Sequence, residues 1–205
     1  MVTRNAIDTG LVVDVPHGGT GRTSWAGSTT NGILKCDGSQ LLTSSLVTID
    51  ANNVILNPQQ PAFFAYKDST TANATGDGTV YPVVFNVEAY DLTSSYNTGT
   101  GVFTAPKTGT YSLSSSVFSN NAGGYARSTM SILFIVNVST VAQQDTYWNN
   151  TVNTLHVWRN VVLNLNANDT VSISAVISGA GAKASNIFGN PAIQMFTYFS
   201  GHLIG

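Results

Sequence analysis

Beyond Pro61 the chain alternates apolar and polar residues with a period of two, which is typical of half-buried β-strands. Such strands are expected over residues 83–89, 111–117, 130–138, 155–165, 171–177 and 196–198. Clusters of glycine, asparagine, threonine and serine, which favour turns, separate most of them. Because short strands alternate with turns and no stretch has helical spacing, the pattern predicts an all-β antiparallel sandwich or jelly roll.

The first 57 residues follow a different pattern. They are rich in glycine, threonine, serine and asparagine, and their apolar stretches are too short to bury a core alone. Asn52-Asn53 predicts a turn between two short strands. A segment of this kind is stable when it winds with copies of itself or packs on a partner. We therefore expect residues 1–57 to form an extended, β-rich attachment and stalk segment, and residues 58–205 to form a head.

The run from Ile132 to Ile135 is apolar on both faces of its expected strand. In a two-layer sandwich one face of each strand meets the core, and the other face is exposed to solvent. A second apolar face indicates contact with another subunit. Ile132 and Phe134 are therefore candidates for a subunit interface.

The composition excludes some classes of binding partner. Charged residues make up only 9% of the chain, against roughly 25% in ordinary soluble domains. The net charge is −2 and lysine and arginine form no block, so we expect no nucleic-acid binding. The longest apolar run, Ile132 to Val136, is too short for a membrane-spanning helix, and we expect neither membrane insertion nor a signal peptide. A surface rich in serine, threonine and asparagine favours an extracellular or virion location.

Few residues carry catalytic or metal-binding chemistry. Cys36 is the single cysteine, which excludes an internal disulfide, and the three histidines have no zinc-ligand spacing. No G-x-S-x-G or H-E-x-x-H motif occurs, so we expect no enzymatic activity and no cofactor. Calcium takes six to eight oxygen ligands, and the acids here are sparse. Asp77 or Asp91 could contribute to a weak calcium site, although a solvated turn acid is the favoured interpretation.

The stretch Pro16 to Ser24 reads PHGGTGRTS and raises the question of a phosphate-binding loop. Such a loop reads G-x-x-x-x-G-K-[ST], follows a buried strand and opens a helix. Here the lysine is absent and no helical pattern follows, so tight turns are the favoured interpretation. The longer run from Val15 to Ser45 resembles a recurrent linker of viral and phage tail-fibre and spike proteins. In those proteins the linker joins an attachment region to a distal head, usually in trimers.

Residues 61–205 resemble the globular head of the complement C1q and tumour-necrosis-factor superfamily. The strongest signature is GVFTAPKTGTYSL at residues 101–113, and FSGHLI at residues 199–204 matches the terminal strand of the family. LNLNANDTV at residues 163–171 resembles a late element of the family, with Asn168 in place of the usual glycine. The resemblance implies a trimeric, ten-stranded jelly roll.

The same resemblance places the terminal strand near the threefold axis of the trimer. Tyr198 and Phe199 lie on that strand, so they join Ile132 and Phe134 as candidates for the trimer interface. The expected partners are therefore further copies of the chain, together with other virion proteins bound through the N-terminal segment.

These patterns together favour a homotrimeric fibre or spike protein of a virus, with a phage as the favoured source, located at the virion surface. Its head would attach to a receptor on a host surface, with a glycan favoured over a protein. Aromatic rings beside asparagine, serine and threonine suit sugar binding. The candidate ligand-binding residues are Tyr125, Tyr147, Trp148 and Trp158, of which Trp158 lies within a strand and is also an interface candidate.

Other classes of function stay open. The chain could be a structural capsid-decoration or tail component that binds no receptor, or a bacterial surface protein with a C1q-like head. An enzyme such as a glycan depolymerase is the weakest interpretation, because such heads usually carry acid pairs and this chain has few acids.

Overall fold

The computed structural model describes residues 32–36, 41–49, 52, 55–121, 128–147, 154–192 and 196–205. The chain divides between Gln59 and Gln60 into two compact units, close to the boundary expected after residue 57. In the first unit, β1 (Gly32–Cys36), β2 (Leu41–Ile49) and β3 (Ile55–Leu56) form an antiparallel sheet. Ile49 pairs with Ile55 and Asn52 lies in a turn between them, as the Asn52-Asn53 pair predicts. Residues 1–31 of the predicted stalk lie outside the described residues.

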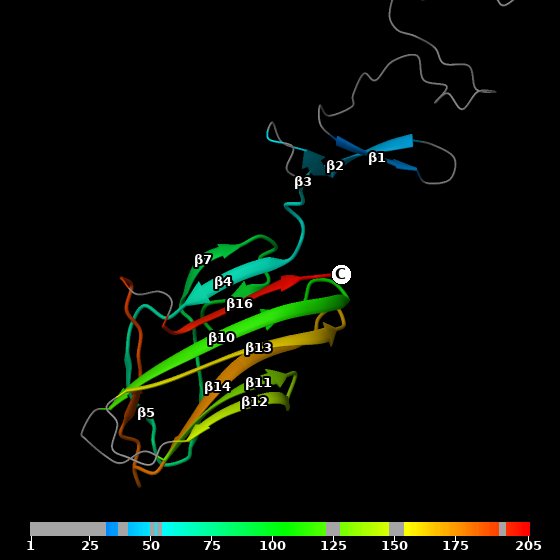
Figure 1. Cartoon of the computed structure of the whole chain (residues 1–205). Coiled ribbons are helices and arrows are strands. Elements are labelled where there is room, and N and C mark those ends of the chain that lie inside the picture. The colour runs from blue at the N-terminus through cyan, green and yellow to red at the C-terminus, as the bar shows by residue number, and fades with distance from the viewer. Residues whose placement is uncertain are drawn as a thin grey trace, which may run out of the picture. The chain divides into compact units, whose positions relative to one another are not determined.

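The second unit, which we call the head, begins at Gln60 and contains two antiparallel sheets (Figure 1). The front sheet has the order β5-β15-β10-β16-β4-β7, and β13 also pairs with β10. Its strands are β4 (Ala62–Tyr66), β5 (Thr71–Thr75), β7 (Val87–Asp91), β10 (Gly109–Asn121), β13 (Thr154–Leu165), β15 (Ser185–Ile187) and β16 (Tyr198–Leu203).

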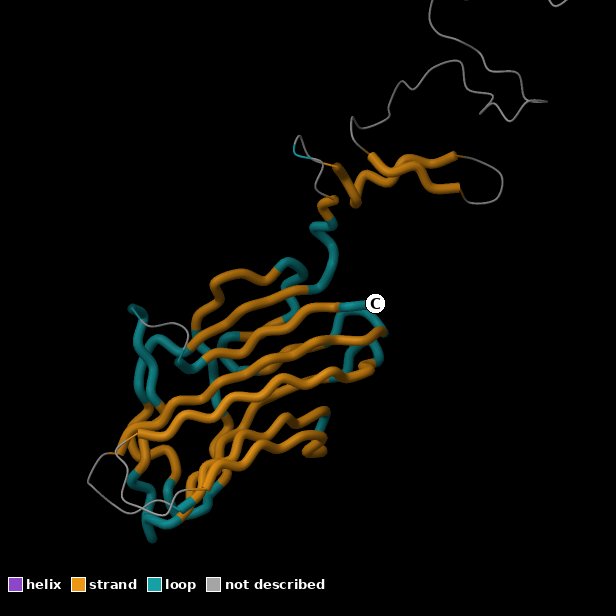
Figure 2. Tube along the Cα trace, viewed as in Figure 1, coloured by secondary structure: helices purple, strands orange, loops and turns teal. Residues whose placement is uncertain are grey.

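The back sheet has the order β12-β11-β14-β9-β8, and β6 also pairs with β14. Its strands are β6 (Val80–Pro82), β8 (Tyr96–Asn97), β9 (Val102–Thr104), β11 (Thr129–Val136), β12 (Ser139–Tyr147) and β14 (Thr170–Ser178). The described residues form strands and loops, without a helix (Figure 2), and among them no helix could therefore cross a membrane. The predicted all-β, jelly-roll-like sandwich is confirmed.

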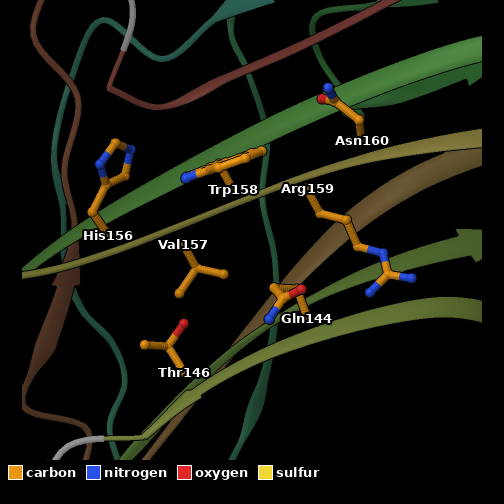
Figure 3. Close-up of a pocket in the computed structure, with 7 residues that line it drawn as sticks. All are labelled: Gln144, Thr146, His156, Val157, Trp158, Arg159 and Asn160. Atoms are coloured by element: carbon orange, nitrogen blue, oxygen red, sulfur yellow. The ribbon is translucent and has the colours of Figure 1, made fainter.

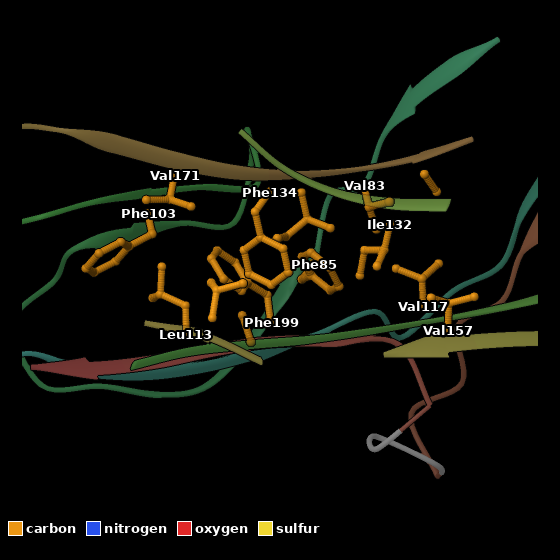
Figure 4. Packing of buried hydrophobic residues seen from close by; sticks show 14 of the residues in the cluster. Val83, Phe85, Phe103, Leu113, Val117, Ile132, Phe134, Val157, Val171 and Phe199 are labelled. Carbon is orange, nitrogen blue, oxygen red and sulfur yellow. The ribbon is translucent and has the colours of Figure 1, made fainter. Parts of the chain in front are cut away.

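The core between the two sheets is built mainly from aromatic rings (Figure 4). Phe63 of the front sheet is central to it. Its ring stacks on Phe103 of the back sheet, with 4.7 Å between centroids, and meets Phe199 edge-on at 4.9 Å. Phe199 in turn meets Phe134 of the back sheet edge-on at 6.2 Å. Such offset and edge-on pairs add roughly 0.5–1.5 kcal/mol each beyond the area that they bury.

Three of the four predicted interface residues are therefore core residues. Ile132, Phe134 and Phe199 are fully buried within a single chain, so they have no surface left for a second subunit. The pleat explains the difference, because each of them points into the sandwich while its neighbour in sequence points outward. Tyr198, the fourth, lies on the outer face. Leu133 also keeps only 9% of its surface exposed within one chain, so the doubly apolar strand requires no partner at that position.

The head has two ends, which the long strand β10 connects. At one end Gln60 enters the head, and its side chain donates to the carbonyl oxygen of Leu203 at 2.7 Å, beside the C-terminus. We call this the proximal end. At the other, distal end β10 finishes at Asn121 (Figure 1). A strand of 13 residues rises about 40 Å, which sets the separation of the two ends.

The turn at Asn168, where the family pattern has glycine, keeps a backbone conformation that glycine favours. Asn168 has a φ of 74°, in the left-handed region, and asparagine tolerates that region better than most residues. The Asp169 carboxylate accepts a hydrogen bond from the Asn166 N–H at 2.8 Å, which closes the turn. The substitution therefore changes the residue without removing the turn.

Removing one buried hydroxyl tests the core. The Tyr96 hydroxyl donates to the Phe85 carbonyl oxygen at 3.0 Å and accepts from the Phe85 N–H at 3.3 Å. Tyr96→Phe leaves both backbone groups without a partner, so we expect the free energy of unfolding to fall by about 1–3 kcal/mol. Tyr90→Phe, at a half-exposed ring, is the matched control and should change stability little. Chemical denaturation measures both, and equal stability of the two variants would contradict the assignment.

Candidate binding surface

The register of the back sheet places one predicted ligand-binding residue at the distal end. Tyr147, the last residue of β12, pairs with Thr129, the first residue of β11. In the front sheet Asn120 of β10 pairs with Thr154, the first residue of β13. The described residues that flank the segments 122–127 and 148–153 therefore lie at the distal end. The Tyr147 side chain is 73% exposed there.

Two further predicted ligand-binding residues belong to these segments. Tyr125 lies in the connection from β10 to β11, and Trp148 follows Tyr147 directly in sequence. Both lie outside the described residues. The strand register nevertheless brings their flanking residues to the same end of the head, although they are far apart in sequence.

Trp158 lies elsewhere, on the outer face of the front sheet, which we define as the face turned away from the core. Cross-strand rows run over this face from β7 to β13. One row consists of Val87, Tyr66, Tyr198, Ser116 and Trp158. The next row consists of Tyr90, Phe64, Ser200, Ser114 and Asn160. Neither row contains a charged side chain.

The outer face carries serines at its centre, an aromatic wall of Phe64, Tyr198 and Tyr90 on one side, and Trp158 and Val162 on the other. On one side Phe64 stacks on Tyr198 with centroids 5.5 Å apart and on Tyr90 at 6.3 Å. On the other side Trp158 is 64% and Val162 is 63% exposed. An exposed apolar face without charge is typical of a surface that another molecule covers. The family resemblance names Tyr198 as an interface candidate, whereas Phe64 and Tyr90, which come from shorter strands, are not among the predicted interface residues.

At the distal part of the same face His156 packs within an aromatic cluster. Its Nε2 lies 2.6 Å from the Ser116 hydroxyl, and its ring lies against Phe118 and Phe196, with 5.7 and 6.1 Å between centroids. Desolvation by these neighbours lowers the pKa of His156 below its usual value of 6.5, although a hydrogen bond involving the Phe196 backbone acts in the opposite direction. The imidazole is therefore neutral near pH 7.

A groove of about 440 Å³ lies between the edge strands β12 and β13 (Figure 3). Its lining residues are Gln144, Thr146, His156, Val157, Trp158, Arg159 and Asn160. Figure 3 shows that Gln144 and Thr146 of β12 face Val157 and Arg159 of β13 across it. The Trp158 side chain projects from the opposite side of β13, so Trp158 belongs to the outer face as well as to the lining of the groove.

The two loop acids considered for a weak calcium site, Asp77 and Asp91, accept hydrogen bonds from nearby backbone N–H groups. Asp91 accepts hydrogen bonds from the N–H groups of Thr93, Ser95 and Tyr96 at 2.6–3.1 Å. The Asp77 carboxylate accepts from the Thr79 N–H at 3.0 Å, and hydrogen bonds with the Thr79 side chain and, to a smaller extent, its backbone lower the pKa of Asp77. Within the described part of the chain, histidine, cysteine and acid side chains form no group of three that could hold a metal ion.

Comparison with known proteins agrees with this fold. A family model described as the C1q domain matches residues 62–204. Among solved structures, the head is similar to the globular domain of zebrafish complement 1qA protein, with 20% identity, a TM-score of 0.51 and coverage of 71% of this chain and 98% of that one. It is also similar to murine APRIL at pH 5.0, with 14% identity, a TM-score of 0.51 and coverage of 71% and 100%. A search of curated proteins gives no match.

The aromatic surroundings of His156 lead to a prediction about its titration with pH. Because the pKa of His156 is lower in the folded chain than in the unfolded chain, its contribution to stability is complete above about pH 6.5 and is lost as the pH falls through the folded value. NMR titration should give a pKa below 6.5 for this residue. Phe118→Ala should raise that pKa towards 6.5 by exposing the ring, whereas Val138→Ala, at a 93% exposed position between β11 and β12, should not. A wild-type pKa at or above 6.5 would refute the desolvation.

Proposed function

The chain belongs to the C1q domain family, whose members are often trimeric and mediate binding, and from this premise we propose that it is the trimeric attachment protein of a viral fibre or spike. Its distal end would bind a glycan on a host surface. The N-terminal unit would join the head to the rest of the virion. The protein would then act outside the cell, at the virion surface.

The observation that carries this proposal is the separation of the two ends of the head. The connection to the N-terminal unit enters at the proximal end, where Gln60 bonds to Leu203. The exposed Tyr147 and the described residues that flank the segments of Tyr125 and Trp148 lie at the distal end, about 40 Å away along β10. A fibre needs this polarity, because the end that holds the particle and the end that meets the receptor must face in opposite directions.

The outer face of the front sheet supports self-association. It presents the Phe64, Tyr198 and Tyr90 rings on one side and Trp158 on the other, and its central rows carry no charged side chain. Aromatic residues are enriched and charged residues are depleted in the cores of protein interfaces. We therefore assign Trp158 to the trimer interface rather than to the receptor site.

The distal end supports a sugar-binding role. Tyrosine and tryptophan rings stack on the apolar faces of sugars, and neighbouring asparagines can bond their hydroxyl groups. Tyr147 is followed by Trp148, Asn149 and Asn150 in sequence. Three such sites on one trimer would bind through high effective concentration, so each site can be weak.

The viral assignment draws on the first unit. The run from Val15 to Ser45, with its GGTG sequence, resembles tail-fibre and spike linkers, and it lies largely outside the described residues. The low content of charged residues, 9% of the chain, suits a surface that works outside the cell. Detection of the protein in purified virions tests this part of the proposal directly.

Self-association is measured first. Light scattering at micromolar concentration should give a mass near three times that of the 21.6 kDa chain. Phe64→Lys places a charge in the aromatic wall and should yield a monomer, because a buried unpaired charge in an interface costs several kcal/mol. Val138→Lys, at a 93% exposed position, is the control and should keep the trimer. A wild-type monomer, or a trimeric Phe64→Lys variant, would rule out this interface.

Receptor binding is measured on a panel of immobilised host-envelope glycans. The wild-type trimer should bind at least one class, and Tyr147→Ala should weaken binding to it roughly tenfold by removing one stacking ring. Ile204→Ala, an exposed position at the proximal end, should leave the binding unchanged. If Tyr147→Ala binds as the wild type does, the receptor site lies elsewhere on the head.

A further inference from the structure

Two histidines lie on the outer face of the front sheet. His156 of β13 lies at the distal part of this face, on the same side of its strand as Trp158 (Figure 3). His202 of β16 lies near the proximal end and is exposed. A third cross-strand row consists of Leu92, Ala62, His202, Ser112 and Val162. This row lies two residues from the row of Phe64, so its side chains point to the same face of the sheet.

The neighbours of His156 on the outer face are uncharged. The Ser116 hydroxyl lies 2.6 Å from the imidazole Nε2, and the Phe118 and Phe196 rings lie against the imidazole ring. Burial and a hydrogen bond of the Phe196 backbone are the causes of the shift in the pKa of His156, and no ionised group is among them. A proton taken up by His156 therefore finds no counter-ion among these neighbours.

The charged residues on the groove side of β13 are turned away from His156. Arg159 projects from the opposite side of the strand (Figure 3). The residues of β12 that line the groove are Gln144 and Thr146, and neither is charged. The Asp145 carboxylate between them is held by hydrogen bonds within the back sheet.

His202 also has uncharged neighbours on the outer face. It pairs with Ser112 of β10 on one side and with Ala62 of β4 on the other, and the residues at the two ends of its row are apolar. Gly205, three residues further on, accepts a hydrogen bond from the Thr110 N–H at 2.6 Å. None of the side chains in this row carries a charge of its own.

The charged residues of β7 and of the segment after β4 lie outside these rows. Glu88 and Asp91 pair with core residues of β4 instead of outward-facing ones. Lys67 keeps only 6% of its surface exposed and interacts with Asp68, whose carboxylate accepts a hydrogen bond from the Asn86 amide at 2.6 Å. The described rows of the outer face therefore offer no carboxylate to a protonated imidazole.

We propose that self-association through the outer face is controlled by pH: the trimer forms while His156 and His202 are neutral and dissociates as they take up protons. The inference rests on the proposed trimer and adds its regulation. In the separate chain water solvates a protonated imidazole. In the trimer each subunit contributes two imidazoles to surfaces that other copies cover, where desolvation without a counter-ion disfavours the charged form. Association is therefore strongest above the titration range of histidine and is lost as the pH falls through it.

The experiment measures the mass of the full-length protein as a function of pH. Sedimentation velocity at micromolar concentration and constant ionic strength covers the range from about pH 8 to about pH 5, in which histidine changes its charge. A trimer is expected at the upper end. Below about pH 6.5 the apparent dissociation constant should rise at least tenfold per pH unit, because dissociation takes up one or more protons. Circular dichroism at each pH establishes that the head stays folded.

Variants then assign the effect to the two histidines. The double variant His156→Gln with His202→Gln should stay trimeric at the lower end of the range. His17→Gln removes the third histidine of the chain, which belongs to the first unit, and is the matched control that should dissociate as the wild type does. His202→Lys fixes a positive charge on the outer face and should be monomeric even at about pH 8.

The results separate this inference from the proposed function. A wild-type monomer at about pH 8 would overturn the proposed trimer and the switch with it. A trimer that persists to about pH 5, or that tightens in acid, would overturn the switch and leave the trimer standing. A double variant that still dissociates would overturn the role of the two histidines. Dissociation that coincides with loss of the β-sheet signal would attribute the acid sensitivity to unfolding and would also overturn the inference.

Discussion

The pairing of β4 with β16, the first and last strands of the head, is the constraint on which the other surfaces depend. Phe63 and Phe199 from these two strands reach across to Phe103 and Phe134 and join the sheets. Because successive side chains in a strand point to opposite faces, burying Phe63 and Phe199 forces Phe64 and Tyr198 outward. The aromatic wall of the outer face is thus a direct consequence of how the core is packed, and a register shift of one residue would exchange the two sets.

The class of fold could be predicted because it depends on local patterns. Alternation along residues 111–117 and 171–177, and turn residues between strands, are visible without any knowledge of the partners of each strand. The family signature at residues 101–113 adds the resemblance to a jelly roll. Asn168, which stands where the family pattern has glycine, keeps the turn, since asparagine adopts the backbone angle that the turn requires.

Which face of each strand meets the core, and which face meets a neighbouring strand or subunit, could not be predicted from local patterns. A run such as Ile132 to Ile135 shows that both faces are apolar, but the sequence does not say which face meets the core and which meets a neighbouring strand or subunit. By this pattern Phe134 is a candidate for an interface, although in the structure it belongs to the core. The groove between β12 and β13 could not be predicted for a related reason, because it forms only where the edge strands of two different sheets approach each other.

The position of Gln60 beside the C-terminus also determines how the head would bear force. The front sheet is entered at the proximal end of β4, and β4 is hydrogen-bonded on both sides, to β16 and to β7. A pull between residue 60 and a ligand held at the distal end would act along the strands. Antiparallel hydrogen bonds run perpendicular to the strands, so such a load shears all bonds of β4 together instead of opening them one at a time. The head is built to resist being pulled from its base, whereas a pull across the sheet would peel strands from its edge in sequence.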